Sequence, residues 1–248
     1  ISQYIQPWEI TEMPNANLES VTTLTFDIFG TVLDLEGSLV PPLNLLLKNC
    51  DAPPTLTGEK VWAQWRLRQR IEQYQDNMLM LGHSGYLTVK RKALMYTLRS
   101  LKVDFRPEHL DEFMKAYQLL TPFKDAVDGL IRLSNKYRLV MLSNGEQHYL
   151  EHLAKNRIGI DFDNILSAET VSQFKPHPSV YRFAAKTLNL EPQHVMMVAA
   201  HSFDILGARH SGFRGAYVNR YDLPYDESDY LPDVITQDFY GLCETLEV

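Results

Sequence analysis

The segment VTTLTFDIFGT, residues 21–31, is a short run of β-branched, aromatic and aliphatic residues that breaks off at an aspartate and a glycine. A run of this kind, bounded by turn residues, predicts a buried strand from Val21 to Phe26. Asp27 then stands at the carboxyl end of the strand, and Gly30 marks a turn. The folded unit is therefore expected to begin near Val21, with a carboxylate at the end of its first strand.

Downstream of Phe123, strand and helix signals alternate along the chain. Such alternation predicts an α/β fold in which helices cover both faces of a parallel sheet. The predicted strands lie at 138–144, 164–167, 194–200 and 215–219, and the predicted helices at 125–136, 147–156, 178–188 and 202–211.

The intervening region, residues 38–119, has a different pattern. Apolar residues recur there at spacings of three and four with charges between them, which predicts a run of helices without strands. The expected organisation is an N-terminal extension at 1–20, an α/β core at 21–37 and 120–248, and an inserted helical cap at 38–119.

Composition restricts the function further. The 248 residues are 45% apolar and 22% charged, with a formal net charge of -7 and basic residues scattered along the chain. Because the basic residues are scattered, they predict no positively charged patch that would bind nucleic acid or an anionic membrane. No apolar run approaches the ~18 residues of a membrane span. The two cysteines lie far apart without metal-ligand spacing. We expect a cytoplasmic enzyme that acts on a small molecule.

Polar residues follow each of the predicted strands. In an open parallel sheet, ligands bind beyond the carboxyl ends of the strands, near the point where strand order reverses. A carboxylate, a hydroxyl and amide pair, a lysine and a second carboxylate should therefore converge at one edge. These candidates are Asp27 with Thr31, Ser143 with Asn144, Lys175, and His201 with Asp204.

At these residues the chain resembles the haloacid dehalogenase superfamily, specifically its type II 2-haloacid dehalogenase branch. The motifs that carry the resemblance are FDIFGTVLD (26–34), LSNG (142–145), KPHPSVY (175–181) and VAAHSFDILGAR (198–209), with WRLRQRIEQY (65–74) and ALMYTLRSL (93–101) in the cap. The resemblance implies a Rossmann-like parallel sheet with an inserted helical-bundle cap. It also implies a homodimer, Asp27 as nucleophile and Arg66 as the residue that receives the halide.

Three positions refine this interpretation. Most members of the superfamily are phosphatases with a second aspartate two residues after the nucleophile, and here that position is Phe29. We therefore expect no metal and no cofactor, and keep a phosphatase or other small-molecule hydrolase with an atypical metal site as the alternative. A non-catalytic binding protein that retains the fold is a third hypothesis. Ala199 and His201 stand where this branch commonly has serine and asparagine.

The expected chemistry is displacement of halide from a short 2-haloalkanoic acid, with inversion, through an ester of Asp27 that water then hydrolyses. Lys175 should keep Asp27 ionised, Asp204 should hold Lys175, and Thr31 should orient the second Asp27 oxygen. Ser143 is expected to bind the substrate carboxylate, and Arg66 and Asn144 the departing halide.

The remaining assignments concern water activation and the pocket wall. His201 is the candidate base, with Glu36 as the acid expected to raise its basicity. Aromatic residues expected in the substrate pocket are Phe29, Tyr181 and Phe203, whereas Trp65 and Tyr86 are more typical of plain core.

Overall fold

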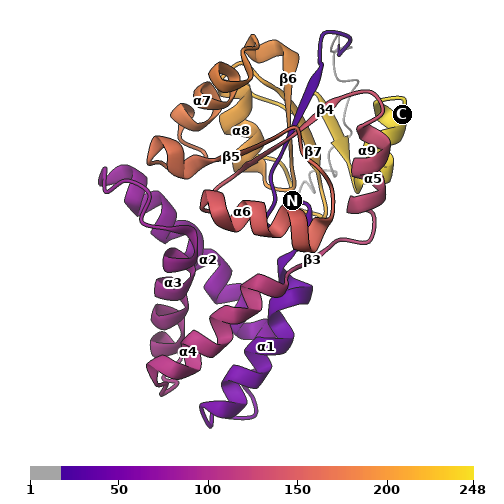
Figure 1. Cartoon of the computed structure of the whole chain (residues 1–248). Helices are drawn as coiled ribbons and strands as arrows, with labels where there is room; N and C mark the ends of the chain where they lie inside the picture. The colour runs from indigo at the N-terminus through magenta and orange to yellow at the C-terminus, as the bar shows by residue number, and fades with distance from the viewer. Residues whose placement is uncertain (1–17) are drawn as a thin grey trace, which may run out of the picture.

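The computed structural model describes residues 18–248. The predicted N-terminal extension falls almost entirely on residues 1–17, which lie outside the described residues. The core is a six-stranded sheet in the order β5-β4-β1-β6-β7-β8, and all neighbouring strands are parallel, which confirms the predicted fold class (Figure 1). The strands are β1 (Thr23–Phe26), β4 (Arg138–Ser143), β5 (Asn164–Ser167), β6 (Val195–Ala199), β7 (Arg214–Val218) and β8 (Val234–Thr236).

Strand β1 occupies the middle of the sheet, paired with β4 on one side and β6 on the other. Strand order reverses at this point, because the chain continues to β4 and β5 on one side and returns to β6, β7 and β8 on the other. Asp27 follows β1 directly and donates its backbone N–H to the Val198 carbonyl of β6. The nucleophile candidate therefore lies where open α/β sheets bind ligands.

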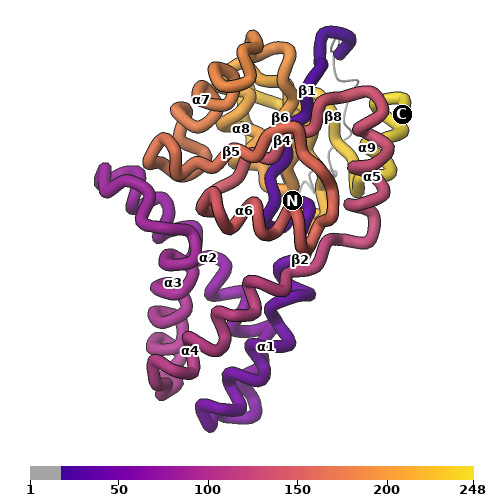
Figure 2. Tube along the Cα trace, in the orientation of Figure 1, coloured from indigo at the N-terminus to yellow at the C-terminus, as the bar shows by residue number. Residues whose placement is uncertain are grey.

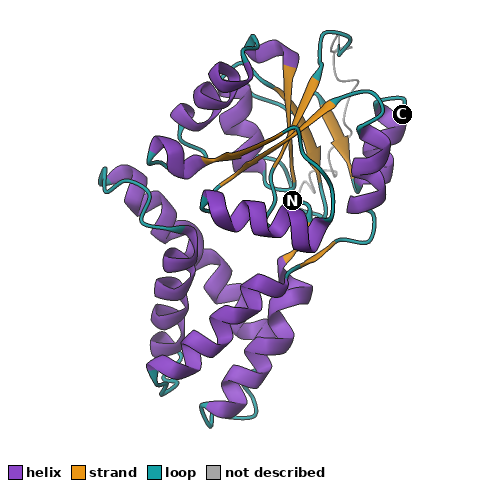
Figure 3. Ribbon diagram, in the orientation of Figure 1, coloured by secondary structure: helices purple, strands orange, loops and turns teal. Residues whose placement is uncertain are grey.

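Helices cover both faces of the sheet (Figure 3). Side chains alternate between faces along a strand, so one strand contributes to two cores: Met141 packs in one and Val140 and Leu142 in the other. The first core contains apolar residues of α5 (Ala126–Leu133), α6 (Gln147–Leu153) and α9 (Phe239–Thr245). The second contains those of α7 (Pro178–Leu188) and α8 (Ser202–His210).

Between β1 and β4 the chain leaves the sheet and forms the cap, which we define as α1 (Leu35–Asn49), α2 (Gly58–Met78), α3 (Tyr86–Ser100), α4 (Pro107–Met114) and the short 3-10 helix Lys115–Leu119. The cap lies beside the sheet, and the chain enters and leaves it through the antiparallel pair β2 (Leu33–Asp34) and β3 (Thr121–Pro122) (Figure 2). Trp65 is fully buried and donates its indole N–H to the Lys90 carbonyl, which joins α2 to α3.

The predicted strands and helices occur close to the expected residues, and the differences lie in short elements. The sequence pattern did not indicate β8 or the β2–β3 pair, because two or three residues carry too little periodicity to be recognised, and it did not indicate the seven-residue helix α9. The helix predicted at 147–156 changes at Ala154 into a π-helical turn that ends at Ile158. Among the described helices, none combines the length and apolarity needed to cross a bilayer.

Candidate active site

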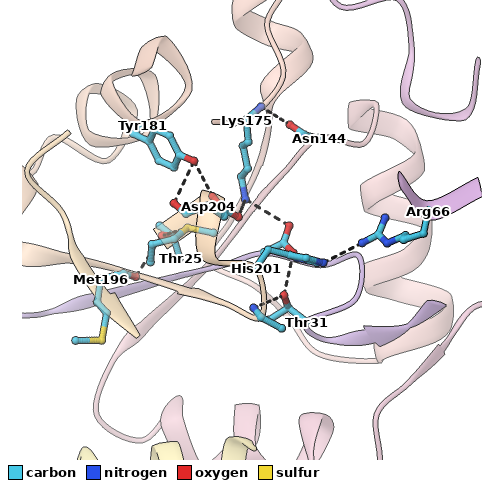
Figure 4. A network of polar contacts seen from close by, with 12 residues as sticks. Thr25, Thr31, Arg66, Asn144, Lys175, Tyr181, Met196, His201 and Asp204 are labelled. Carbon is cyan, nitrogen blue, oxygen red and sulfur yellow. Dashed lines mark hydrogen bonds and ion pairs between the residues drawn. The ribbon is translucent and has the colours of Figure 1, made fainter. Parts of the chain in front are cut away.

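Asp27 is the centre of a buried polar network with Thr31, Lys175 and His201. Figure 4 shows how these three partners lie. One carboxylate oxygen, Oδ2, accepts a hydrogen bond from the Thr31 hydroxyl at 2.8 Å and lies 3.3 Å from His201 Nδ1. The other, Oδ1, has a single contact in this network, at 3.5 Å from Lys175 Nζ. Thr31 is itself held by the Ala200 N–H, which donates to Thr31 Oγ1 at 2.9 Å. One oxygen of Asp27 is thus fixed by neighbours and the other is left comparatively open.

Burial alone would favour the protonated acid at Asp27, because it removes water from the charged form. The Lys175 charge and the hydrogen bonds from His201 and Thr31 outweigh this cost and hold the pKa of Asp27 well below its usual range. Asp27 is therefore an ionised carboxylate that remains only 8% exposed. Poor hydration with retained charge is what a carboxylate nucleophile requires.

Lys175 joins the two buried carboxylates. Its ammonium donates to Asp204 Oδ2 at 2.8 Å and faces Asp27 Oδ1, and the lysine itself is 1% exposed. Tyr181 donates its hydroxyl to Asp204 Oδ1 at 2.7 Å. Burial, followed by the like charge of Asp27, raises the pKa of Asp204 to about 6 despite these partners. The two carboxylates therefore differ in basicity although they share one lysine.

His201 connects the core to the cap. Arg66 of α2 places Nη2 2.9 Å from His201 Nε2. Because a guanidinium only donates, Nε2 must accept, and the ring proton then resides on Nδ1 and points at Asp27. Burial, followed by the charge of Arg66, lowers the pKa of His201 to about 4. The imidazole is therefore neutral at neutral pH and orients Asp27 through its Nδ1 proton.

A cavity between cap and core contains the reactive groups. Its volume of about 30 Å³ corresponds to roughly two water molecules. Core residues on its wall are Asp27, Phe29, Asn144, Lys175, His201, Phe203 and Asp204, and cap residues are Arg66, Arg70, Gln73, Tyr86 and Lys90. Phe29 stacks on Tyr86 with 4.0 Å between ring centroids and supplies an apolar wall next to Asp27.

The structure brings most of the predicted site residues together, but three of them lie elsewhere. Glu36 is exposed in the first turn of α1 and is not a partner of His201, whose neighbouring carboxylate is Asp27. Tyr181 is completely buried behind Asp204 and positions that carboxylate instead of lining the cavity. Ser143 is also fully buried, outside the cavity wall, and its hydroxyl has no partner among the described residues.

Four cap residues of the cavity were not assigned to the site from sequence. Arg70 and Gln73 follow Arg66 on α2 at helical spacings of four and seven, so they share its face. This spacing could have predicted that Arg70 and Gln73 lie beside Arg66. It is a weak indication, because α2 is polar on most of its surface and many of its polar residues belong to no site. Tyr86 and Lys90 belong to α3, and only the packing of α3 against α2 places them beside the nucleophile.

Known proteins share both the sequence pattern and the structure. A family model of haloacid dehalogenase-like hydrolases matches residues 21–212. An (S)-2-haloacid dehalogenase of Xanthobacter autotrophicus is 31% identical over 81% of this chain and 76% of its own length. The (S)-2-haloacid dehalogenase H-109 of Pseudomonas putida is 29% identical over 87% of this chain and 93% of its own length. The structure of the L-2-haloacid dehalogenase from Xanthobacter autotrophicus with chloropropionic acid covalently bound superimposes with a TM-score of 0.78 at 25% identity, covering 92% of this chain and 98% of that one. The chain belongs to the haloacid dehalogenase-like hydrolase family, in its type II 2-haloacid dehalogenase branch.

Proposed function

We propose that this protein hydrolyses the carbon–halogen bond of short 2-haloalkanoic acids and yields 2-hydroxy acids. The observation that carries the proposal is an ionised, poorly hydrated Asp27 that lines the same cavity as the Arg66 guanidinium. The names of the similar proteins, (S)-2-haloacid dehalogenases, support the same reaction.

In the first half-reaction, Asp27 Oδ1 attacks the carbon that bears the halogen. Oδ1 is the oxygen of choice because Oδ2 is already engaged by Thr31 and His201. A C–O bond forms as the C–halogen bond breaks, the halide leaves with the bonding electrons towards Arg66, and the carbon is inverted. Because residues of both the cap and the core line the cavity, the substrate binds between them.

In the second half-reaction, water attacks the carbonyl carbon of the Asp27 ester and loses a proton to a base. The bond between this carbon and the alkoxy oxygen then breaks, the alkoxide takes up the proton and leaves as the 2-hydroxy acid, and Asp27 is regenerated. His201, with its pKa lowered to about 4, is a weak base at neutral pH. Asp204 lines the same cavity and has a pKa raised to about 6, which suits proton abstraction better. We therefore assign water activation to Asp204 and assign the orientation of Asp27 to His201.

The residues at the site do not fit a magnesium ion. Mg²⁺ requires several oxygen ligands, and the two carboxylates present, Asp27 and Asp204, already share the ammonium of Lys175. Phe29, which also lines the cavity, offers no side-chain oxygen as a ligand. The proposed reaction accordingly uses no metal.

A single-turnover experiment in H₂¹⁸O tests this proposal. Excess enzyme is mixed with (S)-2-chloropropionate in the presence of EDTA. The ester mechanism predicts release of chloride, formation of (R)-lactate with an unlabelled hydroxyl, and ¹⁸O in the Asp27 carboxylate. Asp27→Asn should release no chloride.

Two outcomes would contradict the proposal. If the label is found in the lactate hydroxyl after one turnover, water attacks the substrate directly and the ester mechanism is wrong. If none of the short haloacids releases halide, the proposed function is wrong. Mg²⁺-dependent release of phosphate from aryl phosphates would favour the phosphatase alternative.

The homodimer and the cytoplasmic location stay predictions. Light scattering during size-exclusion chromatography measures the first directly, and fractionation of the source cells measures the second.

A further inference from the structure

Three cavity residues of the cap have no role in the reaction proposed above. Lys90 is 1% exposed, and its ammonium makes no hydrogen bond or ion pair with any residue in 18–248; its described contact is the ring of Tyr86, 4.2 Å away. Arg70 lies with its guanidinium carbon 5.5 Å from the ring centre of Phe203 and pairs with no described carboxylate. Gln73 is 6% exposed and shares the cavity wall with both.

All three residues present unused hydrogen-bond donors. Arg70 Nε and Gln73 Nε2 are buried without a partner among the described residues. Buried donors are normally satisfied because an unpaired one costs about 1–3 kcal/mol. An acceptor in the cavity would satisfy them, and because two of the three residues are basic, that acceptor is expected to be an anion.

Charge in the cavity wall leads to the same conclusion. Four basic side chains, Arg66, Arg70, Lys90 and Lys175, face two carboxylates. Burial, followed by the charges of Arg66 and Arg70, lowers the pKa of Lys90 well below its usual range. With all four basic side chains and both carboxylates ionised, the wall carries two net positive charges. A substrate with one carboxylate balances this wall only if Lys90 loses its proton, whereas a substrate with two carboxylates balances it with Lys90 protonated.

We propose that Arg70, Lys90 and Gln73 form a second anion site in the cap, and that the preferred substrates are 2-haloacids with a second anionic group, of the type of 2-chlorosuccinate. The inference rests on the proposed dehalogenase function and specifies its substrate class. The second carboxylate binds the cap, while the reacting carbon lies at Asp27 and the halide at Arg66.

The experiment compares 2-chlorosuccinate with 2-chlorobutyrate, which differ only in a carboxylate in place of a methyl group. The quantity measured is the ratio of their kcat/KM values. We expect the unaltered protein to favour 2-chlorosuccinate by about tenfold or more. Lys90→Met should lower that ratio by on the order of 30-fold, because it removes one partner of a buried charge pair. Arg70→Met should lower it in the same direction.

Lys92→Met is the matched control, because Lys92 is exposed on the same helix and should leave the ratio unchanged. A ratio at or below one in the unaltered protein overturns the inference. Equal losses for both substrates in Lys90→Met also overturn it, since Lys90 would then serve the carboxylate that all haloacids share. Calorimetric titration with succinate and propionate involves no turnover, so a preference for succinate that Lys90→Met removes tests the site even if the dehalogenase proposal fails.

Discussion

Asp27 and Asp204 are buried carboxylates on either side of one lysine, and their surroundings move their pKa values in opposite directions. Asp27 has Lys175, His201 and Thr31 to stabilise its charge, whereas for Asp204 the cost of burial and the charge of Asp27 outweigh the help of Lys175. Two acids whose pKa values differ in this way can have different roles, one as the nucleophile and the other as the base.

This division predicts a different pH dependence for each half-reaction. Asp204 must be ionised to act as base, so the rate constant for ester hydrolysis should fall at acidic pH. The inflection should lie below the pKa of about 6 that Asp204 has in the free enzyme, because esterified Asp27 no longer carries the like charge that helps to raise it. Asp27 stays ionised there, because its pKa is lowered, so a burst of halide should persist at acidic pH while the ester accumulates. Rapid-quench kinetics between acidic and neutral pH measures both steps. His201→Asn should retain the inflection; loss of the inflection in that variant would reassign the base to His201.

Arg66 should act on the first half-reaction. It is the cavity guanidinium that contacts His201, and charge develops on the halide beside it. Arg66→Met should slow the halide burst by about 10²–10³-fold, the usual effect of removing a donor aimed at developing charge. Arg68→Met is the control, because Arg68 pairs with Glu72 and does not line the cavity. A normal burst in Arg66→Met would remove Arg66 from the halide site.

At the scale of elements, α7 and α8 support the site through close packing at Gly207. A Cβ at this position would lie 2.8 Å from Pro176 Cβ and from the Tyr181 hydroxyl. Pro176 follows Lys175, and Tyr181 holds Asp204, so the spacing of the two helices controls the spacing of the lysine and the second carboxylate.

Gly207→Ala should therefore impair both stability and activity. Overpacking of this kind costs about 1–3 kcal/mol in the free energy of unfolding, which urea titration measures. Activity should fall further than stability explains, because Asp204 and Lys175 are displaced. Gly241→Ala serves as control: its Cβ would meet neighbours at 3.5 Å or more, and alanine favours helix α9. Equal behaviour of the two variants would contradict this account.

At the scale of the whole molecule, the cap is held over the core by contacts with the loops that carry the site. Asn77 of α2 donates to the Phe174 carbonyl at 2.7 Å and accepts from the Phe174 N–H at 2.8 Å, next to Lys175. His83 lies 2.9 Å from the Asn144 carbonyl and stacks on Phe174. The cap therefore contacts the loops that carry Lys175 and Asn144.

Asn77→Ala should weaken the contact between the cap and the core. We expect KM for a haloacid to rise by about tenfold, the equivalent of about 1.4 kcal/mol, because two hydrogen bonds between the cap and the core are lost. Steady-state halide release measures this effect. Asn49→Ala, exposed on α1 of the same cap, is the control. If both variants behave alike, the Asn77 contacts do not contribute to substrate binding.

The order of the longer elements, the parallel sheet and the position of Asp27 after β1 could be predicted from the sequence alone, because periodicity and turn residues are local properties of the chain. Asp27, Thr31, Lys175 and Asp204 could be predicted together since the carboxyl ends of parallel strands meet at one edge. Tertiary structure alone decided the rest. It paired His201 with Asp27 and Arg66 instead of Glu36, placed Tyr181 behind Asp204, and brought Arg70 and Lys90 into the cavity. These outcomes depend on how α2 and α3 pack on each other and on the core, and that packing joins residues far apart in the chain through contacts that no local pattern encodes.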